Sequence, residues 1–265
     1  MSKKLWQPSL IVKKNSNLFA FENYISKKLK IKFNRNYKKL SNWSIKNSPV
    51  FWSRFWDFSK IKGIKSNKNF RKSKIFYKNL FLPGSRLNFG ENLLSKNNNE
   101  KAVTFVSENG FREERSWRQL NLNTNKISNF LKKINIKKGD RVAAYMPNTI
   151  QTVEAFIATT SLGGIWSSCS PDFGSKGVIE RFSQINPKVL FITDQYFYNG
   201  KKIDILNRLP EILKLIPSIK SVVISNYPGK KFIKFKYKFK KINLFKWNAL
   251  MQTNVEKIDF KRFDF

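Results

Sequence analysis

The sequence predicts an α/β protein in which a helical leader precedes the first βα units of a parallel, helix-covered sheet. From about residue 100 onward, apolar runs of strand length alternate with longer segments whose apolar residues recur at helical spacing. Strands joined by helices of this length form parallel sheets covered on both faces. The chain has 265 residues, of which 41% are hydrophobic and 15% aromatic, so it can bury a sizeable core.

The first ninety residues have a different pattern. Residues 17–31 and 48–61 each carry apolar side chains at helical spacing, which predicts two helices. In the second helix the phenylalanines and tryptophans form adjoining stripes, which are more often a docking face than a ligand site. Residues 59–79 carry lysines and few acids, which is typical of a connector. A Pro-Gly turn and a short helix are expected over residues 81–94.

The alternating part of the chain begins with a hairpin over residues 101–117 that turns at Asn109-Gly110. Asn148 is expected to cap a helix that Gly163 and Gly164 end. Pro210 must start or interrupt the last predicted helix. The predicted strands are residues 140–146, 165–169, 188–193 and 221–225, and the predicted helices are residues 117–133, 148–162, 175–185 and 203–216.

Chemical variety concentrates in the stretch GGIWSSCSPDFG, residues 163–174, in a chain otherwise rich in lysine, asparagine, isoleucine and phenylalanine. Its second half leaves the carboxyl end of a predicted strand, which is where open α/β sheets bind ligands. Glycine and serine there let backbone amides approach a phosphate or carbonyl, and the next helix N-terminus favours anions. A tight connection without a ligand explains the same residues, and the spacing alone leaves both interpretations open.

The formal net charge of +35 comes from 52 basic and 17 acidic residues. Such a charge is typical of proteins that bind nucleic acids or anionic membranes. Only 11 of the basic residues are arginine, the side chain best suited to reading guanine and phosphate. A codon bias toward lysine, asparagine, isoleucine and phenylalanine explains the charge without a specific partner, and we favour this interpretation.

Lysine and aromatic residues alternate over residues 230–241, in the stretch KKFIKFKYKFKK. Alternation with a period of two predicts a strand with one solvated face, and lysines on an edge strand block unwanted pairing. An aromatic and basic strand could also stack single-stranded bases. No RNP-type signature accompanies this stretch, so the edge strand is the favoured interpretation.

Several classes of protein are excluded by what the sequence lacks. It contains no histidine and a single cysteine, Cys169, which rules out Ser-His-Asp and Cys-His catalysis, the usual zinc sites and an intrachain disulfide. No run of about 18 apolar residues could span a membrane. The N-terminus lacks the apolar stretch of a secretory signal, so a cytoplasmic location and no membrane partner are expected.

Several motifs carry a family resemblance: GDRVAAYMPN, EAFIATTSLGGIWSSCSPDFG, RFSQINPKVLFITD and YNGKK, together with LWQPS, FWSRFWDFS and PGSRLNFGENLL in the leader. They resemble the acetoacetyl-CoA synthetases (acetoacetate–CoA ligases) of the adenylate-forming acyl-CoA synthetase superfamily. The resemblance implies a helical N-terminal segment over residues 1–95. It also implies the N-terminal part of the AMP-binding domain over residues 96–265, an incomplete large domain that stops before the phosphate loop.

The family is expected to activate acetoacetate with ATP and Mg²⁺ and then transfer the acyl group to coenzyme A. This chemistry requires a phosphate loop of the type SGTTGxPK, a later Thr-Glu motif, an Asp for the ribose and a C-terminal lysine. None of these is in the 265 residues. The resemblance therefore implies an N-terminal fragment that is inactive alone, holds no catalytic or metal-binding residue, and supports neither ATP, Mg²⁺ nor coenzyme A by itself.

Few site residues are implied by the resemblance. In related synthetases the segment leaving this strand lines the coenzyme A entrance, and here it falls on Ser170, Pro171 and Asp172. Two basic residues three apart approach the 3′-phosphate of coenzyme A, and these positions hold Tyr198 and Lys201. Only one of the pair keeps its charge, and Lys201 is one of 41 lysines, so a purely structural role explains it equally well.

Two other interpretations remain open. The first is a basic, non-enzymatic α/β module that binds nucleic acid, which would carry an Arg-rich or RNP-like surface that the sequence lacks. The second is one half of a split enzyme, completed by the missing C-terminal portion as a separate chain. In the enzyme interpretation the partner is the small-molecule substrate acetoacetate, and no specific nucleic acid is bound.

Overall fold

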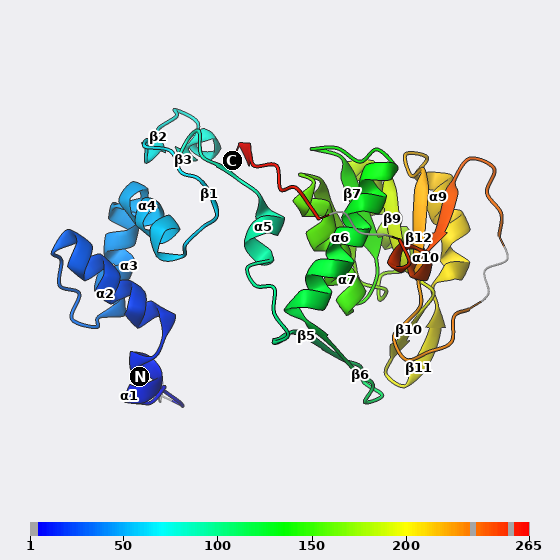
Figure 1. The fold of residues 1–265 in the computed structure, drawn as a ribbon, viewed down its shortest axis with the longest axis horizontal. Helices are drawn as coiled ribbons and strands as arrows, with labels where there is room; N and C mark the ends of the chain where they lie inside the picture. The colour runs from blue at the N-terminus through cyan, green and yellow to red at the C-terminus, as the bar shows by residue number, and fades with distance from the viewer. Residues whose placement is uncertain (1–4, 234–236, 254–256, 265) are drawn as a thin grey trace. The chain divides into compact units, whose positions relative to one another are not determined.

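The computed structural model describes residues 5–233, 237–253 and 257–264. The chain divides into two compact units, Met1–Leu87 with Asp264–Phe265, and Asn88–Phe263. The first unit is mainly helical, and the second contains the parallel sheet (Figure 1). No helix among the described residues is long and apolar enough to cross a membrane.

An aromatic core holds the first unit together. The ring of Phe21 lies 5.6 Å from that of Phe51, 5.7 Å from that of Phe55 and 5.1 Å from that of Phe58. The aromatic stripe of residues 48–61 thus packs partly within its own unit. Both predicted helices are confirmed, and two further helices, over residues 10–14 and 37–46, were not predicted. The helices are α1 (Leu10–Lys14), α2 (Asn17–Leu29), α3 (Tyr37–Lys46) and α4 (Ser48–Phe58).

The predicted connector, residues 59–79, contains short pieces of regular structure. These pieces pair as two-residue antiparallel bridges, such as Phe70 with Phe81 and Gly63 with Leu87. The connector contains β1 (Gly63–Ile64), β2 (Phe70–Arg71) and the 3₁₀ helix η1 (Phe76–Lys78), and β3 (Leu80–Phe81) and β4 (Arg86–Leu87) follow it. A further two-residue strand, β14 (Phe263–Asp264), comes much later in the sequence.

The second unit is built on a five-stranded sheet with the order β13-β12-β9-β7-β8. All neighbouring strands are parallel, which confirms the predicted fold class. Four of the strands match the predicted segments, and the fifth, β13, was not predicted. The strands are β7 (Arg141–Tyr145), β8 (Ile165–Cys169), β9 (Val189–Thr193), β12 (Ser221–Ser225) and β13 (Asn243–Lys246).

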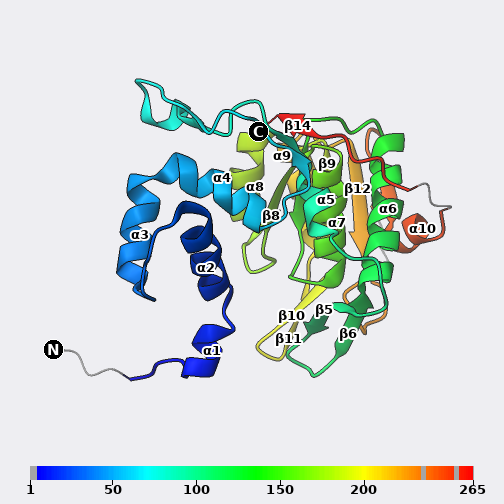
Figure 2. The same ribbon diagram turned by 60° about the vertical axis from the view of Figure 1, so that its left-hand side comes forward.

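Helices cover both faces of this sheet (Figure 2). The helices of the unit are α5 (Phe89–Leu93), α6 (Trp117–Lys133), α7 (Ile150–Ser161), α8 (Ser175–Ile185), the 3₁₀ helix η2 (Leu206–Arg208), α9 (Leu209–Leu215) and α10 (Trp247–Met251). Val142 and Ala144 face α6, α7 and α10, whereas Ala143 and Tyr145 face α8 and α9. Alternate residues of one strand thus enter separate cores, as expected for a buried parallel strand. Pro210 lies in the first turn of α9.

Two hairpins extend from the unit beyond the sheet. The predicted one is confirmed as β5 (Lys101–Val106) and β6 (Arg112–Ser116). The other, β10 (Gln195–Tyr198) and β11 (Lys201–Asp204), was not predicted. Asn199 and Gly200 form its turn, with φ angles of 49° and 71°. Positive φ at both central residues is the requirement of a type I′ turn.

Three sequence-based predictions are wrong in whole or in part. The helix predicted over residues 203–216 begins only at Leu209, because residues 203–204 pair within β11 and residues 206–208 form η2. The N-cap of α7 is Thr149 and not Asn148, because the amide of Thr149 bonds to the carbonyl of Pro147 and the helix begins one residue later. The described part of residues 230–241 forms no strand, and residues 234–236 lie outside the described residues. Phe232 and Phe239 instead pack against the core, and β13 occupies the edge position.

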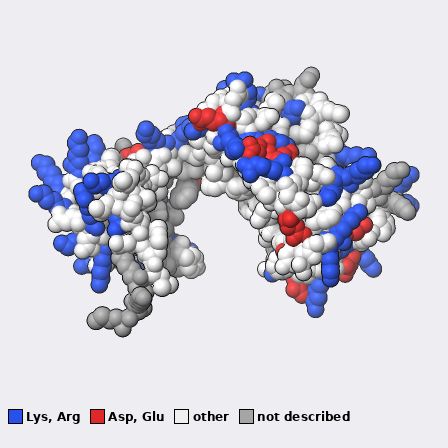
Figure 3. Space-filling view, turned by 90° about the horizontal axis from the view of Figure 1, so that it is seen from below, with Lys and Arg blue, Asp and Glu red and all other residues white. Residues whose placement is uncertain are grey.

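Charged side chains are spread over the surface. On the face seen in Figure 3, lysine and arginine cover both units, and acidic side chains lie among them mainly on the second unit. The sequence agrees, since residues 1–80 hold 21 basic residues but only two acidic ones, Glu22 and Asp57.

Asp194, directly after β9, is fully buried and organises the carboxyl edge of the sheet. Its Oδ1 accepts the backbone N–H of Tyr227 at 2.7 Å, and its Oδ2 accepts that of Ile233 at 2.9 Å. The side chain of Gln195 donates to Oδ2 at 3.1 Å. Burial raises the pKa of Asp194, and these hydrogen bonds oppose that shift. The carboxylate therefore fixes the segment that follows β12.

Glu154 of α7 is a second fully buried acid. Its Oε1 accepts a hydrogen bond from Asn123 at 2.7 Å and lies 3.4 Å from Nε of Arg115, which also pairs with Glu113 at 2.6 Å. Its Oε2 has no hydrogen-bond partner. Burial raises the pKa of Glu154 to about 7, although Asn123 and Arg115 oppose the shift. The interface between α6 and α7 thus favours the protonated acid.

Replacing Asp194 with Asn tests its structural role. One of the two backbone N–H groups would then face an amide NH₂ group and lose its acceptor, which costs about 1–3 kcal/mol. We expect Asp194→Asn to lower the free energy of unfolding by this amount in urea denaturation followed by circular dichroism. The exposed Asp259→Asn change is the control, and equal stabilities of the two variants would refute the role.

The substitution Glu154→Gln is expected to change how stability depends on pH. The folded chain keeps a proton on Glu154 that the unfolded chain releases between its ordinary pKa of 4.5 and about 7. The stability that this proton supplies is complete below pH 4.5 and is lost as the pH rises through 7. A neutral glutamine avoids this loss. The difference in free energy of unfolding between Glu154→Gln and wild type should therefore shift in favour of the variant by up to about 3 kcal/mol from pH 5 to pH 8.5.

The measurement for Glu154 is urea unfolding of both proteins across this pH range. Glu180→Gln, which changes an exposed glutamate of α8, is the control and should follow the wild-type curve. Parallel curves for wild type and Glu154→Gln would contradict the assignment.

Candidate functional site

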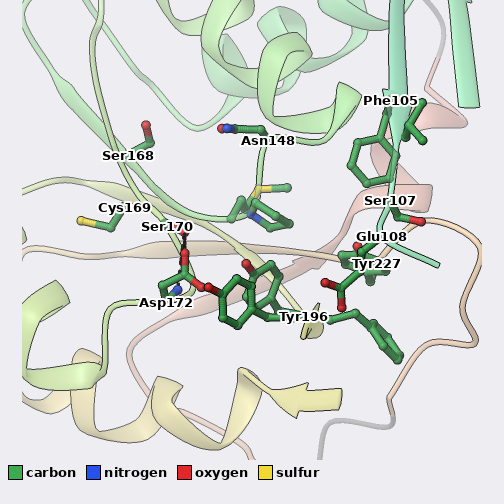
Figure 4. A pocket seen from close by; sticks show the side chains of 15 residues that line it. Phe105, Ser107, Glu108, Asn148, Ser168, Cys169, Ser170, Asp172, Tyr196 and Tyr227 are labelled. Carbon is green, nitrogen blue, oxygen red and sulfur yellow. Dashed lines mark hydrogen bonds between the residues drawn. The ribbon is translucent and has the colours of Figure 1, made fainter. Parts of the chain in front are cut away.

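A cavity of about 340 Å³ opens at the carboxyl edge of the sheet, beyond β7 and β8. It is lined by residues 105–108, 146–148, 168–170, 172, 196–198 and 227. Figure 4 shows Ser170, Asp172 and Tyr196 close together on one side, with Glu108 and Tyr227 on the other. Ligands of open α/β sheets bind at this edge. The cavity is therefore the candidate site.

The structure places the predicted site residues differently. Ser170 and Asp172 line the cavity, and the Ser170 hydroxyl donates to the Asp172 carboxylate at 2.7 Å. Pro171 is buried between them and does not line the cavity. Lys201 is exposed and also outside the lining, but it pairs across the β10–β11 hairpin with Tyr198, which does line it. Two of the four predicted residues, Ser170 and Asp172, thus line the cavity, and the other two do not.

The two hairpins meet at the rim of the cavity through Glu108. Its carboxylate accepts the backbone N–H groups of Asn199 at 2.9 Å and of Gly200 at 3.1 Å. These contacts fix the turn that precedes Lys201 in the chain. Glu108 therefore stabilises the hairpin turn at the rim of the cavity.

Aromatic rings form the wall opposite the Ser170 loop. The ring of Tyr227 lies 6.2 Å from that of Phe105 and 5.3 Å from that of Phe197. The ammonium group of Lys230 lies 4.9 Å from the centre of the Phe197 ring, a cation–π contact. This wall offers apolar ring surface to the cavity, and Lys230 adds a positive charge beside Phe197.

The polar groups of the site favour binding over covalent chemistry. Burial and a hydrogen bond to Asp172 raise the pKa of Tyr196 to about 12, so its hydroxyl remains a donor. Burial raises the pKa of Cys169, which keeps it a thiol and a poor nucleophile. Of the described residues that line the cavity, Glu108 and Asp172 are carboxylates, and none is lysine or arginine.

The described residues do not fit a metal centre. No three acidic or cysteine side chains among them lie close enough together to hold a metal ion, and the chain has no histidine. No step is assigned to Mg²⁺ at this cavity.

Sequence reasoning missed several lining residues. The sequence predicts Asn148 only as a helix cap, whereas it is exposed and lines the cavity. Glu108, Tyr196 and Tyr227 carried no recognisable motif of their own. The Asn199-Gly200 pair was a readable signal for the second hairpin, which brings Tyr196 and Tyr198 to the cavity.

Comparison with known proteins gives consistent matches. Residues 92–244 match the AMP-binding enzyme family. The chain is 38% identical over 233 residues to acetoacetyl-CoA synthetase of Xenopus tropicalis, a match that covers 85% of this chain and 34% of that protein. It is 34% identical over 225 residues to acetoacetyl-coenzyme A synthetase of Rhizobium meliloti (strain 1021), with the same two coverages.

A solved structure agrees with these matches. Acetoacetyl-CoA synthetase from Streptomyces lividans superimposes with a TM-score of 0.87 and 25% identity, covering 99% of this chain and 40% of that one. The chain spans about a third of the length of the curated relatives it matches. Its sequence similarity, its helix-covered parallel sheet and the family match over most of the second unit lead to one conclusion. The chain belongs to the AMP-binding enzyme family.

Proposed function

We propose that this chain supplies the coenzyme A side of the active site of an acetoacetate–CoA ligase. The complete reaction converts ATP, acetoacetate and coenzyme A to acetoacetyl-CoA, AMP and diphosphate. In this proposal residues 1–95 are the leading helical segment, and residues 96–265 are the N-terminal part of the AMP-binding domain. The observation that carries it is the cavity that Ser170 and Asp172 line at the carboxyl edge of the sheet.

The cavity has features that suit parts of coenzyme A. The aromatic wall of Phe105, Phe197 and Tyr227 provides apolar surface for the adenine or the pantetheine arm. Lys201 is exposed on the β10–β11 hairpin, opposite Tyr198, and in this proposal it contacts a phosphate of coenzyme A. In this proposal the cavity residues bind and orient coenzyme A; burial keeps Cys169 a thiol, and the chain has no histidine.

The ATP-dependent part of the reaction needs groups that these residues do not provide. The sequence has no phosphate loop of the SGTTGxPK type, and that loop supplies the amides that stabilise charge during phosphate chemistry. We assign adenylation to further residues, which belong to the same polypeptide or to a separate C-terminal chain. The relatives, about three times longer than the matched region, have room for them.

Binding of desulfo-coenzyme A, which lacks the thiol, tests the assignment of the cavity. We expect titration calorimetry to show saturable binding that weakens as salt is added. Lys201→Ala should weaken it about fivefold, since one exposed phosphate contact contributes up to about 1 kcal/mol. Lys220→Ala removes the same charge at the amino end of β12 and should leave the affinity unchanged. Equal affinities for all three proteins would remove Lys201 from the site.

The large net charge makes a second prediction about nucleic acids. If the lysines are solvated surface, binding to unrelated single- and double-stranded oligonucleotides should be blind to sequence. Its affinity should fall by roughly 10³ or more between 50 and 200 mM salt. Competition between the oligonucleotides at about 150 mM salt is the measurement. Selective, salt-resistant binding would favour a nucleic-acid module, because base contacts and stacking are less screened than phosphate contacts.

A further inference from the structure

The loop that lines the cavity is held from behind by Arg208. Its Nη1 atom donates to the carbonyl of Pro171 at 3.1 Å and to that of Phe173 at 3.0 Å. The same nitrogen donates to the hydroxyl of Tyr145. That hydroxyl in turn lies within donating distance of both carbonyls. Three acceptors thus converge on one half-buried guanidinium group.

The bonded groups alternate with the groups that face the ligand space. Ser170 and Asp172 line the cavity, whereas Pro171 and Phe173 turn their carbonyls toward Arg208. Arg208 thus binds the loop on the side away from the cavity. A change at Arg208 would alter the cavity without removing any residue that lines it.

This contact is anchored in the core of the second unit. Tyr145 is fully buried at the end of β7, where it pairs in register with Cys169 of β8. Arg208 ends η2, next to the buried Leu209 that begins α9. Among the described residues Arg208 makes no ion pair within 4.0 Å, so its positive charge acts on the carbonyl and hydroxyl dipoles. Hydrogen bonds from a charged donor are stronger than neutral ones.

We propose that Arg208 and Tyr145 form a latch that holds residues 170–173 in the conformation that shapes the cavity. Arg208 is then a positioning residue for the coenzyme A site, and this last step rests on the proposed function. A protein whose binding-competent state is only partly populated binds its ligand more weakly by that fraction. Loss of the latch should therefore weaken ligand binding through the loop.

The single cysteine of the chain provides a reporter for the latch. Cys169 directly precedes the loop, lines the cavity and is only 4% exposed. A thiol reagent reaches it when the loop moves away or when the whole protein unfolds. The two routes differ because global unfolding accelerates with urea, whereas a local opening exposes little surface and responds weakly.

The experiment measures the rate at which iodoacetamide labels Cys169 in the full chain, with and without low concentrations of urea. Arg208→Gln should raise the urea-insensitive rate about tenfold, because the loop loses its charged donor. Arg208→Lys, which keeps the positive charge but not the planar guanidinium group, should give an intermediate rate. Arg118→Gln makes the same chemical change at an exposed position of α6 and should label like wild type.

Tyr145→Phe is an independent variant that removes one oxygen atom from the latch. It should also raise the urea-insensitive rate, so the test survives if Arg208→Gln folds poorly. Labelling of Arg208→Gln and Tyr145→Phe at the wild-type rate would overturn the latch. A faster rate that appears only in urea would also overturn it, because that result marks general destabilisation.

Desulfo-coenzyme A separates the latch from the proposed function. In wild type it should slow labelling of Cys169, and a higher concentration should be needed for Arg208→Gln. If wild type binds no desulfo-coenzyme A while Arg208→Gln still labels faster, the latch stands and the coenzyme A role of Arg208 is overturned. If both proteins bind it equally well, the latch does not affect coenzyme A affinity and the positioning role of Arg208 fails.

Discussion

The hydrogen bonds of the buried Asp194 carboxylate are the interaction on which the carboxyl edge of the sheet depends. A buried carboxylate costs free energy unless donors replace its lost water, and here two backbone amides and one side-chain amide do so. The same residue connects neighbouring strands, since its own N–H bonds to the carbonyl of Ser225 at 2.8 Å. Tyr227 can form one wall of the cavity because its backbone is tied to this carboxylate.

The site combines this fixed wall with contacts of a different kind on its other sides. At the rim, the hairpin turn is held by Glu108 through backbone amides. On the opposite side, the Ser170 loop is held through its backbone carbonyls by Arg208. The carboxylates of Asp194 and Glu108 thus bind backbone amides, and the guanidinium group of Arg208 binds backbone carbonyls. The aromatic rings and the side chains of Ser170 and Asp172 remain free to line the cavity.

The sequence was informative where a local pattern decides the structure. The helical spacing of residues 117–133 agrees with the observed bounds of α6, and the strand predicted for IWSSC places the Ser170 loop at the sheet edge. The contacts that shape the cavity join residues far apart in sequence. Asp194 meets amides 33 and 39 residues away, and Glu108 meets amides 91 and 92 residues away. A single sequence has no periodicity that reports such pairs. The strand prediction for residues 230–241 failed for a related reason, because alternation of side chains does not specify a neighbouring strand to pair with.

The strand order has a consequence for how the chain is synthesised. β7 is the first strand of the sheet to leave the ribosome, and it lies between β8 and β9. Each later strand then pairs with one already made: β8 and β9 with β7, β12 with β9, and β13 with β12. Parallel pairing is slow when distant partners must find each other, and exposed strand edges invite aggregation meanwhile. A sheet that grows outward from its earliest strand shortens the time that each strand edge stays unpaired, because the pairing partner of every new strand has already been synthesised.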